Sequence, residues 1–510
     1  MFVRSYSAIN LGLVIKKIEV EIDTVIGKPG FILIGLANQA VEESKERISA
    51  ALLHCGVRIK ALRTVVNLAP AELKKTSSAL ELAIAVALLC QYQEIKIDCQ
   101  KALFLGELSL TGQLKAVKGI LAIALQARAL GFSELYFPAS NLDELRLIKD
   151  LKLFPLKSLA ELITLAKSNS LDQLTVRAKN YSISQQNNSL LKVPDLAEFQ
   201  EQDQAKRALT LCAAGGHHLL LFGEPGAGKT YLAQSILSIL PNLVEKEILE
   251  ISQIYSLLAP LEKGLLTQRP FRQPHQSISK AAFLGSLDYP GELSLAHLGI
   301  LFLDEFVEFR RDLIEALRQP LENNYFQISR TKYKIIYPAN FTLIAAANPC
   351  PCGFYGSEKP CRCSTYDLLR YQKKLSGPIL DRIDLSIRIK ANCQRELFFS
   401  NKNTETSREI RQQVVKAKQI QNQRFLHSTF SSNANLTSDG VKHFCRLSKK
   451  AKSILDLARS QLDLSVRAYF KTIKVAQTIS DFQEESIISH QAIAEALSFR
   501  QTPINLSEKY

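Results

Sequence analysis

No stretch of this sequence is apolar for long enough to cross a lipid bilayer. The most apolar helix-like run, residues 79–90, carries Glu81 and falls short of the ~20 apolar residues that a membrane-spanning helix needs. The first residues, Met1–Tyr6, lack the charged and then apolar layout of a signal peptide, and no lipidation signal stands out. These absences argue against a membrane or secreted protein, so the chain is expected to be cytoplasmic, without a membrane partner.

Repeats of the solenoid kind are also missing, and 510 residues predict about three globular domains. Hydrophobic residues make up 46% of the chain, which is enough for ordinary cores. Acidic residues are in the minority, since 64 Lys and Arg against 49 Asp and Glu leave a formal net charge of +15. This excess favours a polyanionic partner, nucleic acid before membrane.

The sequence pattern changes along the chain and predicts three folded regions. Residues 1–178 mix short strand-like runs with helical stretches, and residues 179–192 form a polar linker with almost nothing to bury. Residues 193–395 alternate apolar strands with longer helices, which predicts an α/β domain whose parallel sheet is covered by helices on both faces. Residues 396–510 are helical in pattern.

The segment 223–230, GEPGAGKT, matches the phosphate-binding pattern G-x-x-x-x-G-K-[ST] and follows the apolar run 219–222. Its glycines let backbone N–H groups surround phosphate oxygens, and the next helix offers its positive end. Lys229 is expected to reach the β- and γ-phosphates, and Thr230 to ligate Mg²⁺. ATP and Mg²⁺ are therefore the expected cofactors. The expected nucleotide contacts come from Gly223, Glu224, Pro225, Gly226, Ala227, Gly228, Lys229, Thr230 and Tyr231.

Two later strands end in side chains suited to ATP hydrolysis. The apolar run 300–303 is followed by Asp304, expected to hold Mg²⁺, and by Glu305, expected to polarise the attacking water. A second apolar strand, 341–347, ends at Asn348, which would sit between the γ-phosphate and that water. The alternative, in which the two acids only cap the next helix, is the less favoured.

Two arginines are candidates for contacts with the γ-phosphate. Arg382 lies in the segment SGPILDRID and is expected to serve the nucleotide of a neighbouring subunit, where a guanidinium stabilises transition-state charge. Arg370 is the reserve for this role, and a plain salt bridge from Arg382 to Asp381 or Asp384 is the alternative. Arg467 opens a C-terminal helix and would reach back to the γ-phosphate from a helical lid.

The order of these motifs resembles the magnesium-chelatase-like branch of the AAA+ ATPases, and within it the ComM (YifB) family. The resemblance also rests on the segments 269–275, 290–297 and 347–353 and covers almost the whole chain. Gln276 departs from it, because relatives more often carry a second histidine there. It implies a homo-hexameric ATPase ring, a DNA motor or helicase, and branch migration of DNA in recombination during natural transformation. Single-stranded and branched DNA and recombination proteins are the partners that it implies.

A chelatase-type AAA+ chaperone, which remodels a protein partner for metal insertion, is the alternative function. It predicts an ATPase that is indifferent to DNA.

Three cations stand at alternate positions of the segment 327–337, and strand alternation places them on one side. In similar AAA+ motors an insertion at this point is a hairpin that points into the pore of the ring. Phosphate contacts from it would be independent of DNA sequence and sensitive to salt, while a solvated strand face is an equal alternative. The candidate DNA contacts are Arg330, Lys332 and Lys334 and, less favoured, Arg272 and Lys280 from a second insertion at 264–286.

The chain has ten cysteines, which should stay reduced in a cytoplasmic protein, so clustered ones indicate metal rather than disulfides. Two C-x-C pairs, Cys350 with Cys352 and Cys361 with Cys363, offer four thiolates for a tetrahedral Zn²⁺ site. The spacing is tighter than the common C-x₂-C, and free reduced cysteines are the alternative. The cluster follows Asn348 directly, so a metal here would fix that loop.

Residues up to about 170 resemble the α+β ribosomal-protein-S5-like fold shared with the proteolytic domain of Lon. This raises a rival function, peptide hydrolysis by a Ser–Lys pair. Ser78 falls near the place of the nucleophile, but Leu121 stands where the lysine should be, and Lys118 is on another face of the helix. Since the serine lacks a base, residues 1–178 are expected to be non-catalytic and to serve assembly or DNA engagement.

Overall fold

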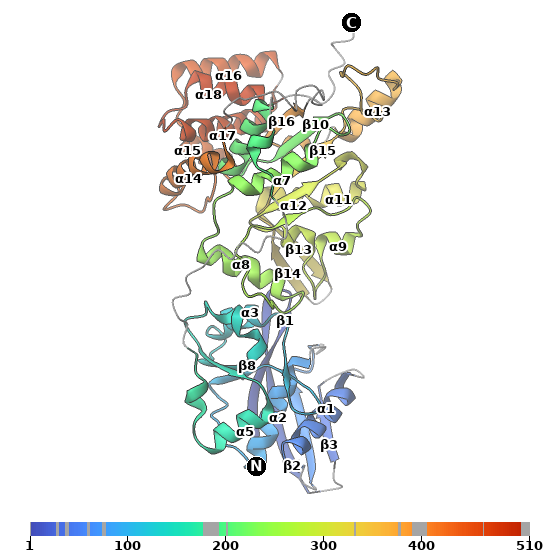
Figure 1. Cartoon of the computed structure of the whole chain (residues 1–510), viewed down its shortest axis with the longest axis vertical. Helices are drawn as coiled ribbons and strands as arrows, with labels where there is room; N and C mark the ends of the chain where they lie inside the picture. Colours follow the sequence, from blue (N-terminus) through green and yellow to red (C-terminus); the bar gives the residue numbers. More distant parts are fainter. Residues whose placement is uncertain are drawn as a thin grey trace.

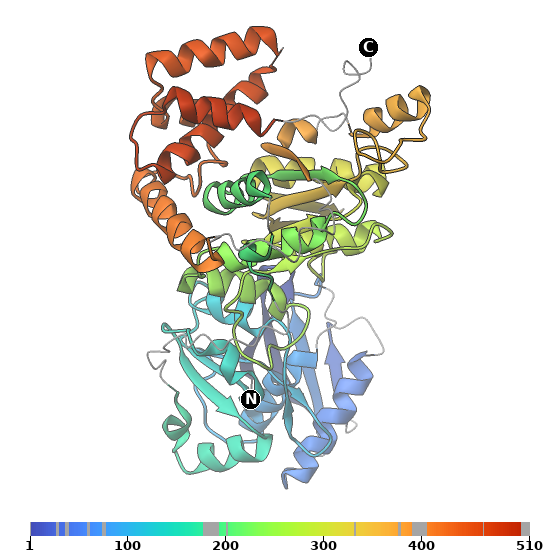
Figure 2. The same ribbon diagram turned by 45° about the horizontal axis from the view of Figure 1, so that its top comes forward.

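The computed structural model describes residues 2–26, 30–35, 40–58, 62–73, 78–176, 193–199, 202–330, 333–375, 379–389, 405–462 and 464–500. The chain is elongated, with its N-terminal region at one end, a parallel sheet in the middle and a group of helices at the other end (Figure 1). The C-terminal helices stand beside the central sheet (Figure 2). The linker expected at 179–192 lies outside the described residues.

A four-stranded sheet organises the N-terminal region, with strand order β1-β2-β4-β3. Its pairs are antiparallel except for β3 with β4. Alternate residues of the second strand, Ile18, Val20 and Ile22, are buried, because successive side chains of a strand point to opposite faces. The elements of this half are β1 (Val3–Leu11), β2 (Val14–Val25), β3 (Gly30–Ile34), α1 (Ala40–His54), β4 (Arg63–Ala69), η1 (Ser78–Leu80) and α2 (Glu81–Gln91).

A smaller parallel sheet with strand order β5-β8-β9 completes the N-terminal region. The rings of Phe104, Tyr136 and Phe154 stack across it, with centroid separations of 4.8 and 4.4 Å. Its elements are β5 (Ala102–Phe104), β6 (Glu107–Leu108), β7 (Leu114–Lys115), α3 (Ile120–Ala127), β8 (Glu134–Pro138), η2 (Ala139–Asn141), α4 (Leu142–Leu145), β9 (Lys152–Leu156), α5 (Leu159–Lys167) and η3 (Leu171–Leu174).

The central region is a five-stranded sheet in the order β11-β12-β15-β10-β16, and all its pairs are parallel. This confirms the α/β architecture predicted from alternating strands and helices. The elements up to β12, the strand that precedes the acid pair, are η4 (Leu196–Glu198), α6 (Asp203–Gly215), β10 (Leu219–Gly223), α7 (Lys229–Ile239), α8 (Glu245–Ser256), β11 (Phe271–Arg272), α9 (Lys280–Leu284), α10 (Glu292–Leu295) and β12 (Ile300–Leu303).

The rest of the central region inserts a hairpin, β13–β14, before the next core strand. Residues of β10, β12 and β15 are almost all buried, as expected for strands covered on both faces. The remaining elements are η5 (Phe306–Glu308), α11 (Arg311–Ala316), α12 (Arg318–Asn323), β13 (Tyr325–Arg330), β14 (Tyr333–Pro338), β15 (Thr342–Ala347), α13 (Thr365–Leu375), η6 (Leu380–Arg382) and β16 (Leu385–Ile389).

The N-terminal and central regions are packed together. One buried apolar cluster contains residues of both. The amide of Gly119 donates to the carbonyl of Ser256 at 2.7 Å, and Lys149 pairs with Glu245 at 2.8 Å. The hairpin lies at this junction (Figure 1).

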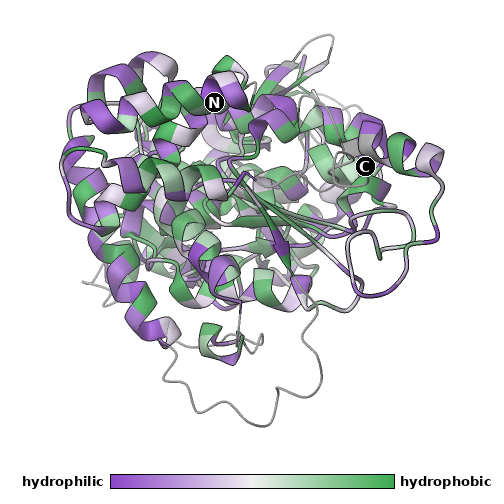
Figure 3. Ribbon diagram, turned by 90° about the horizontal axis from the view of Figure 1, so that it is seen from above, coloured by the Kyte–Doolittle hydropathy of each residue, from purple (hydrophilic) through white to green (hydrophobic). Residues whose placement is uncertain are grey.

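Five helices form the described part of the C-terminal region, residues 405–462 and 464–500. Each begins after a Ser or Thr whose side-chain oxygen accepts a backbone N–H of the first turn, a cap that stabilises a helix by about 1 kcal/mol. Hydrophilic and hydrophobic residues alternate along the outer helices (Figure 3). Among the described residues, no helix is both long and apolar enough to cross a membrane. The helices are α14 (Ser407–Arg424), α15 (Ser438–Phe444), α16 (Lys449–Gln461), α17 (Val466–Phe482) and α18 (His490–Ser498).

Candidate nucleotide-binding site

The loop between β10 and α7 has the backbone shape of a phosphate cradle. Gly226 and Gly228 adopt left-handed conformations, with φ of +81° and +76°. A Cβ added to either would meet nothing within 4 Å. Glycine is therefore required here by the backbone conformation. α7 begins at Lys229, so the positive end of this helix faces the loop.

The Lys229 ammonium lies at the mouth of this loop. It donates to the carbonyls of Gly223 and Glu224, both at 2.9 Å, and to Oδ1 of Asn348 at 3.2 Å. Burial lowers the pKa of Lys229, while the negative charge of Asp304 acts in the opposite direction. The ammonium thus has several short contacts that phosphate oxygens can replace, and it already connects the loop to Asn348.

Hard oxygen ligands lie beside the loop. The Thr230 hydroxyl donates to Oδ2 of Asp304 at 2.8 Å, and a hydroxyl with a carboxylate suits Mg²⁺, which prefers oxygen. Glu305 is exposed and has a φ of +50°. A left-handed residue other than glycine costs about 1–3 kcal/mol and is found most often at functional sites. These residues fit a Mg·ATP complex with a free carboxylate next to it.

Asn348 follows β15, the strand between β10 and β12. The Tyr371 hydroxyl donates to its backbone carbonyl at 3.0 Å. The sequence predicts that the phosphate-binding loop, the acid pair and the amide each follow a strand. The structure brings Lys229, Thr230, Asp304 and Asn348 together through hydrogen bonds.

The two candidate arginines lie together at a second place. Nη2 of Arg382 and Nη2 of Arg467 both contact Oε1 of Glu322, the latter at 3.6 Å. They line a cavity of about 550 Å³, and no residue of the loop 223–230 is among its lining. Glu322 was not singled out in the sequence, because nothing local distinguishes this helix glutamate from a solvated one. Arg370 lines a different cavity.

A buried ion pair supports the arginine segment. Asp384 pairs with Lys471 at 2.9 Å and accepts a hydrogen bond from the amide of His218 at 3.0 Å. Burial by itself raises the pKa of Asp384, but Lys471 and His217 hold it well below its ordinary value. The alternative from the sequence is a plain salt bridge from Arg382 to Asp381 or Asp384. In the structure Arg382 forms an ion pair with a different acid, Glu322.

The candidate DNA-binding hairpin requires one correction. Residue Arg330 is paired with Tyr333, and Lys334 is paired with Ser329. Paired residues share a face and neighbours alternate, so positions 330 and 334 belong to opposite faces of the hairpin. The expectation that the three cations lie on one side is wrong, because the chain reverses between them. Lys334 is exposed, whereas Lys332 and the side chain of Arg330 lie outside the described residues.

The second candidate insertion offers less to a DNA phosphate. Arg272 makes a two-pronged ion pair with Glu292, with contacts of 2.7 and 2.6 Å. Its guanidinium is thus engaged within the chain. Lys280, at the start of α9, is exposed.

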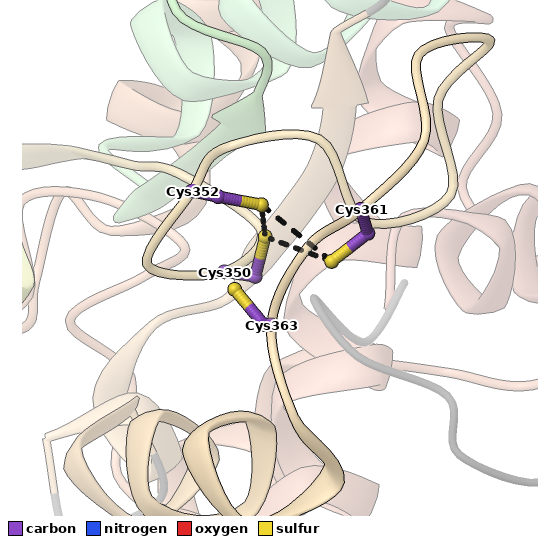
Figure 4. Close-up of side chains that lie close together, drawn as sticks. All are labelled: Cys350, Cys352, Cys361 and Cys363. Atoms are coloured by element: carbon purple, nitrogen blue, oxygen red, sulfur yellow. Dashed lines mark hydrogen bonds between the residues drawn. The ribbon is translucent and has the colours of Figure 1, made fainter.

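The four clustered cysteines converge on one point (Figure 4). Sγ of Cys350 lies 3.3 Å from Sγ of Cys352 and 3.8 Å from Sγ of Cys361. The sulfur atoms of Cys352 and Cys361 are 3.5 Å apart. With Cys363 all four sulfur atoms lie within 4.8 Å of one another. A tetrahedron with Zn–S bonds of ~2.3 Å has edges of about 3.8 Å, whereas a disulfide needs about 2.05 Å. The donor set fits zinc.

In the described part of the N-terminal region, the hydroxyl of Ser78 donates to Oε2 of Glu107. Residues 74–77, directly before this serine, lie outside the described residues. Leu121 is fully buried, and Lys118 is exposed. A carboxylate partner alone does not present the lysine base that the rival function requires.

The strand order, the loop around Lys229 and the acids after β12 define a P-loop domain of the AAA+ type. Three family profiles match the chain: "Magnesium chelatase, subunit ChlI" over residues 195–397, "Subunit ChlI of Mg-chelatase" over 20–141, and "Magnesium chelatase, subunit ChlI C-terminal" over 404–500. AAA+ membership implies ATPase activity, with ATP and Mg²⁺ as cofactors.

Full-length relatives narrow the family further. Competence protein ComM of Haemophilus influenzae is 38% identical over 97% of this chain and 96% of its own length. The uncharacterized protein YifB of Escherichia coli is 37% identical over 96% of this chain and 95% of its own length. Magnesium-chelatase subunit ChlI of Euglena gracilis is 23% identical over 46% of this chain. The chain belongs to the ComM/YifB family of magnesium-chelatase-like proteins.

Proposed function

We propose that this protein is an ATP-driven DNA motor that works as a homo-hexameric ring. Lys229, Thr230 and Asp304 hold Mg·ATP, Glu305 activates the attacking water, and Asn348 orients that water. The observation that carries the ATPase half is the hydrogen-bonded convergence of loop, acid and amide at neighbouring strand ends. Positioning and charge stabilisation are what phosphoryl transfer requires of a protein.

The arginine pair supports the ring. Arg382 and Arg467 share Glu322 in a cavity that the chain's own phosphate-binding loop does not line. Guanidinium groups placed there serve the nucleotide of an adjacent protomer, so ATP sits between subunits. For Arg467 this differs from the contact expected from the sequence, in which it reaches back from a helical lid. Glu322 holds both groups until a neighbour's γ-phosphate competes for them.

DNA is the proposed substrate. The net charge of +15 favours a polyanion, and Lys334 is exposed on a hairpin inserted into the ATPase domain. With Arg330 and Lys332 it would contact phosphates without reading bases. Arg272 and Lys280 are secondary candidates. Arg272 is less favoured because its guanidinium is already paired with Glu292.

The family supports a more specific role. A full-length relative is named a competence protein, so we propose branch migration or unwinding of DNA in recombination during natural transformation, together with recombination proteins. The competence protein is 38% identical over 97% of this chain, whereas the magnesium-chelatase subunit is 23% identical over 46% of it; this difference favours the DNA motor over a chelatase-type chaperone. We further propose that residues 1–178 are a non-catalytic S5/Lon-like domain and that residues 396–510 form the helical lid.

Zinc is proposed as a structural ion of the four-cysteine site. Thiolates are soft ligands that select zinc among the abundant divalent ions, and four of them leave no open position for substrate.

The proposal is tested by ATP hydrolysis at low salt, with and without single-stranded and branched DNA. Lys229→Ala protein serves as the background control. We expect strong stimulation that is lost as salt rises, because phosphate contacts release counterions. Robust hydrolysis with no response to any DNA would favour the remodelling chaperone, and DNA-stimulated hydrolysis without movement of a branched junction would remove branch migration alone.

A further inference from the structure

The four-cysteine loop lies directly against the phosphate-binding loop. Gly353, between the two cysteine pairs, has a φ of +86°, and a Cβ added to it would lie 2.6 Å from Cδ and 2.7 Å from Cγ of Pro225. Pro225 belongs to the phosphate-binding loop. Cys350, the buried member of the cluster, follows Asn348 along the chain. The cysteine loop therefore contacts the cradle at Pro225 and is joined to Asn348 by the chain itself.

A second set of contacts fastens the same loop to the sheet. Nη2 of Arg388 donates to the carbonyl of Tyr355 at 2.9 Å and to the carbonyl of Gly356. Arg388 is on β16 and is paired with Phe222 of β10, the strand that leads into the phosphate-binding loop. The cysteine loop is thus fastened to β16, the strand that pairs with the one leading into the cradle.

The loop lacks an apolar core of its own. From 350 to 364 only Cys350 and Gly353 are buried, so burial of side chains cannot fix its shape. In such segments a bound metal supplies the folding free energy. The amide of Gly353 donates to the carbonyl of Cys350 at 3.0 Å, and the convergence of the four sulfur atoms joins the two ends of the turn that carries Gly353. Together with Arg388, these contacts hold Gly353 against Pro225.

We infer that the metal-closed four-cysteine loop is a brace that holds the phosphate-binding loop and Asn348 in the ATP-binding conformation. This inference rests on the proposed ATPase and zinc site. It makes nucleotide affinity depend on zinc, although the four cysteines lie outside the phosphate-binding loop. Gly353 and the cysteines are positioning residues, and their loss should change the affinity for ATP rather than the affinity for DNA measured without nucleotide.

The test uses the full chain and Gly353→Ala. An added methyl group 2.6 Å from Pro225 must be displaced by about 1 Å to reach ordinary carbon contact, and a misplacement of about 1 Å can slow an enzyme by about 100-fold. All four cysteines remain, so zinc content should be unchanged. We expect ATP affinity, measured by equilibrium binding, to fall by about 10-fold or more.

Gly131→Ala is the matched control. Gly131 is also left-handed, with a φ of +94°, but its Cβ would meet nothing within 4 Å, and it lies in the N-terminal region, outside the cysteine loop and the phosphate-binding loop. It introduces the same backbone strain without the push on Pro225. ATP affinity within twofold of the unchanged protein is expected.

Cys352→Ser with Cys363→Ser removes the metal. Loss of bound zinc, measured by elemental analysis, should accompany a loss of ATP affinity as large as that of Gly353→Ala. Wild-type ATP affinity in both variants would overturn the brace and leave the ATPase intact. Absence of zinc from the unchanged, active protein would overturn the metal. Failure of the unchanged protein to bind ATP would instead refute the proposed function.

Discussion

The ion pair between Asp384 and Lys471 allows a sharp test of how the C-terminal helices stabilise the ATPase domain. The nitrogen–oxygen distance is 2.9 Å, and the two side chains are only 6% and 13% exposed. Lys471→Met keeps a long apolar side chain but leaves a buried carboxylate unpaired. Removing one partner of such a pair costs about 3–5 kcal/mol. At a urea m-value of about 1.5–3 kcal/mol per molar, the unfolding midpoint should fall by about 1–3 M.

The pH dependence of this variant gives an independent check. In the unchanged protein the pKa of Asp384 is held well below its ordinary value, so its stabilising contribution is present above about pH 3.9 and is lost as pH falls through the lower folded pKa. Without Lys471 the largest factor that lowers the pKa of Asp384 is lost, so this pKa should rise, while His217 still opposes the effect of burial. The deficit in unfolding free energy should then be largest at neutral pH and should shrink as acid protonates Asp384.

An exposed pair provides the control. Lys442 and Asp439 are 3.3 Å apart, with side chains 68% and 88% exposed. Lys442→Met should cost less than about 1 kcal/mol. A loss below about 1 kcal/mol in Lys471→Met as well, or a deficit that grows toward acid pH, would refute the reasoning. Asp384→Asn combined with Lys471→Met should recover part of the loss, because no uncompensated charge remains.

Three further changes test the proposed chemistry. Lys229→Ala should abolish ATP binding or turnover, since the ammonium that reaches the phosphates is lost; normal hydrolysis by this variant would exclude the loop as the ATP site. Glu305→Gln should bind ATP but hydrolyse it at least about 100-fold more slowly, and rapid single-turnover hydrolysis would assign water activation elsewhere. Replacing Arg330, Lys332 and Lys334 by alanine should weaken DNA binding and reduce the slope of log affinity against log salt concentration by about 0.9 for each lost phosphate contact. Unchanged affinity would show that the hairpin does not contact DNA.

Local pattern was sufficient for the features that one segment of chain encodes. The phosphate-binding loop, the parallel sheet and the clustering of the four cysteines follow from consecutive residues or short spacings, and the structure agrees with the sheet and the clustering. Zinc itself and the roles of Asp304 and Glu305 remain predictions.

Long-range partners were not accessible in this way. No local pattern around Glu322 marks it as a functional residue. Its role as a shared partner is visible only in the folded chain, where Arg382 of η6 and Arg467 of α17 both contact it. The face of the hairpin cations was misjudged because strand alternation does not continue through a chain reversal. The contact of Gly353 with Pro225 joins segments far apart in sequence, and only the folded chain reveals it.

One face of α17 connects these long-range contacts into a mechanical argument. Arg467, Lys471, Lys474 and Thr478 recur at helical spacing and so lie on one side of the helix. Arg467 contacts Glu322, and Lys471 pairs with Asp384. Lys474 donates to the carbonyl of Ala434. Thr478 forms a hydrogen bond with His217, a buried residue just before β10. Asp384 in turn stands next to the segment of Arg382. A single helix therefore connects Arg467 with the segment of Arg382 and with the chain that enters the sheet, so Lys471→Met is expected to disturb the arginine site as well as stability.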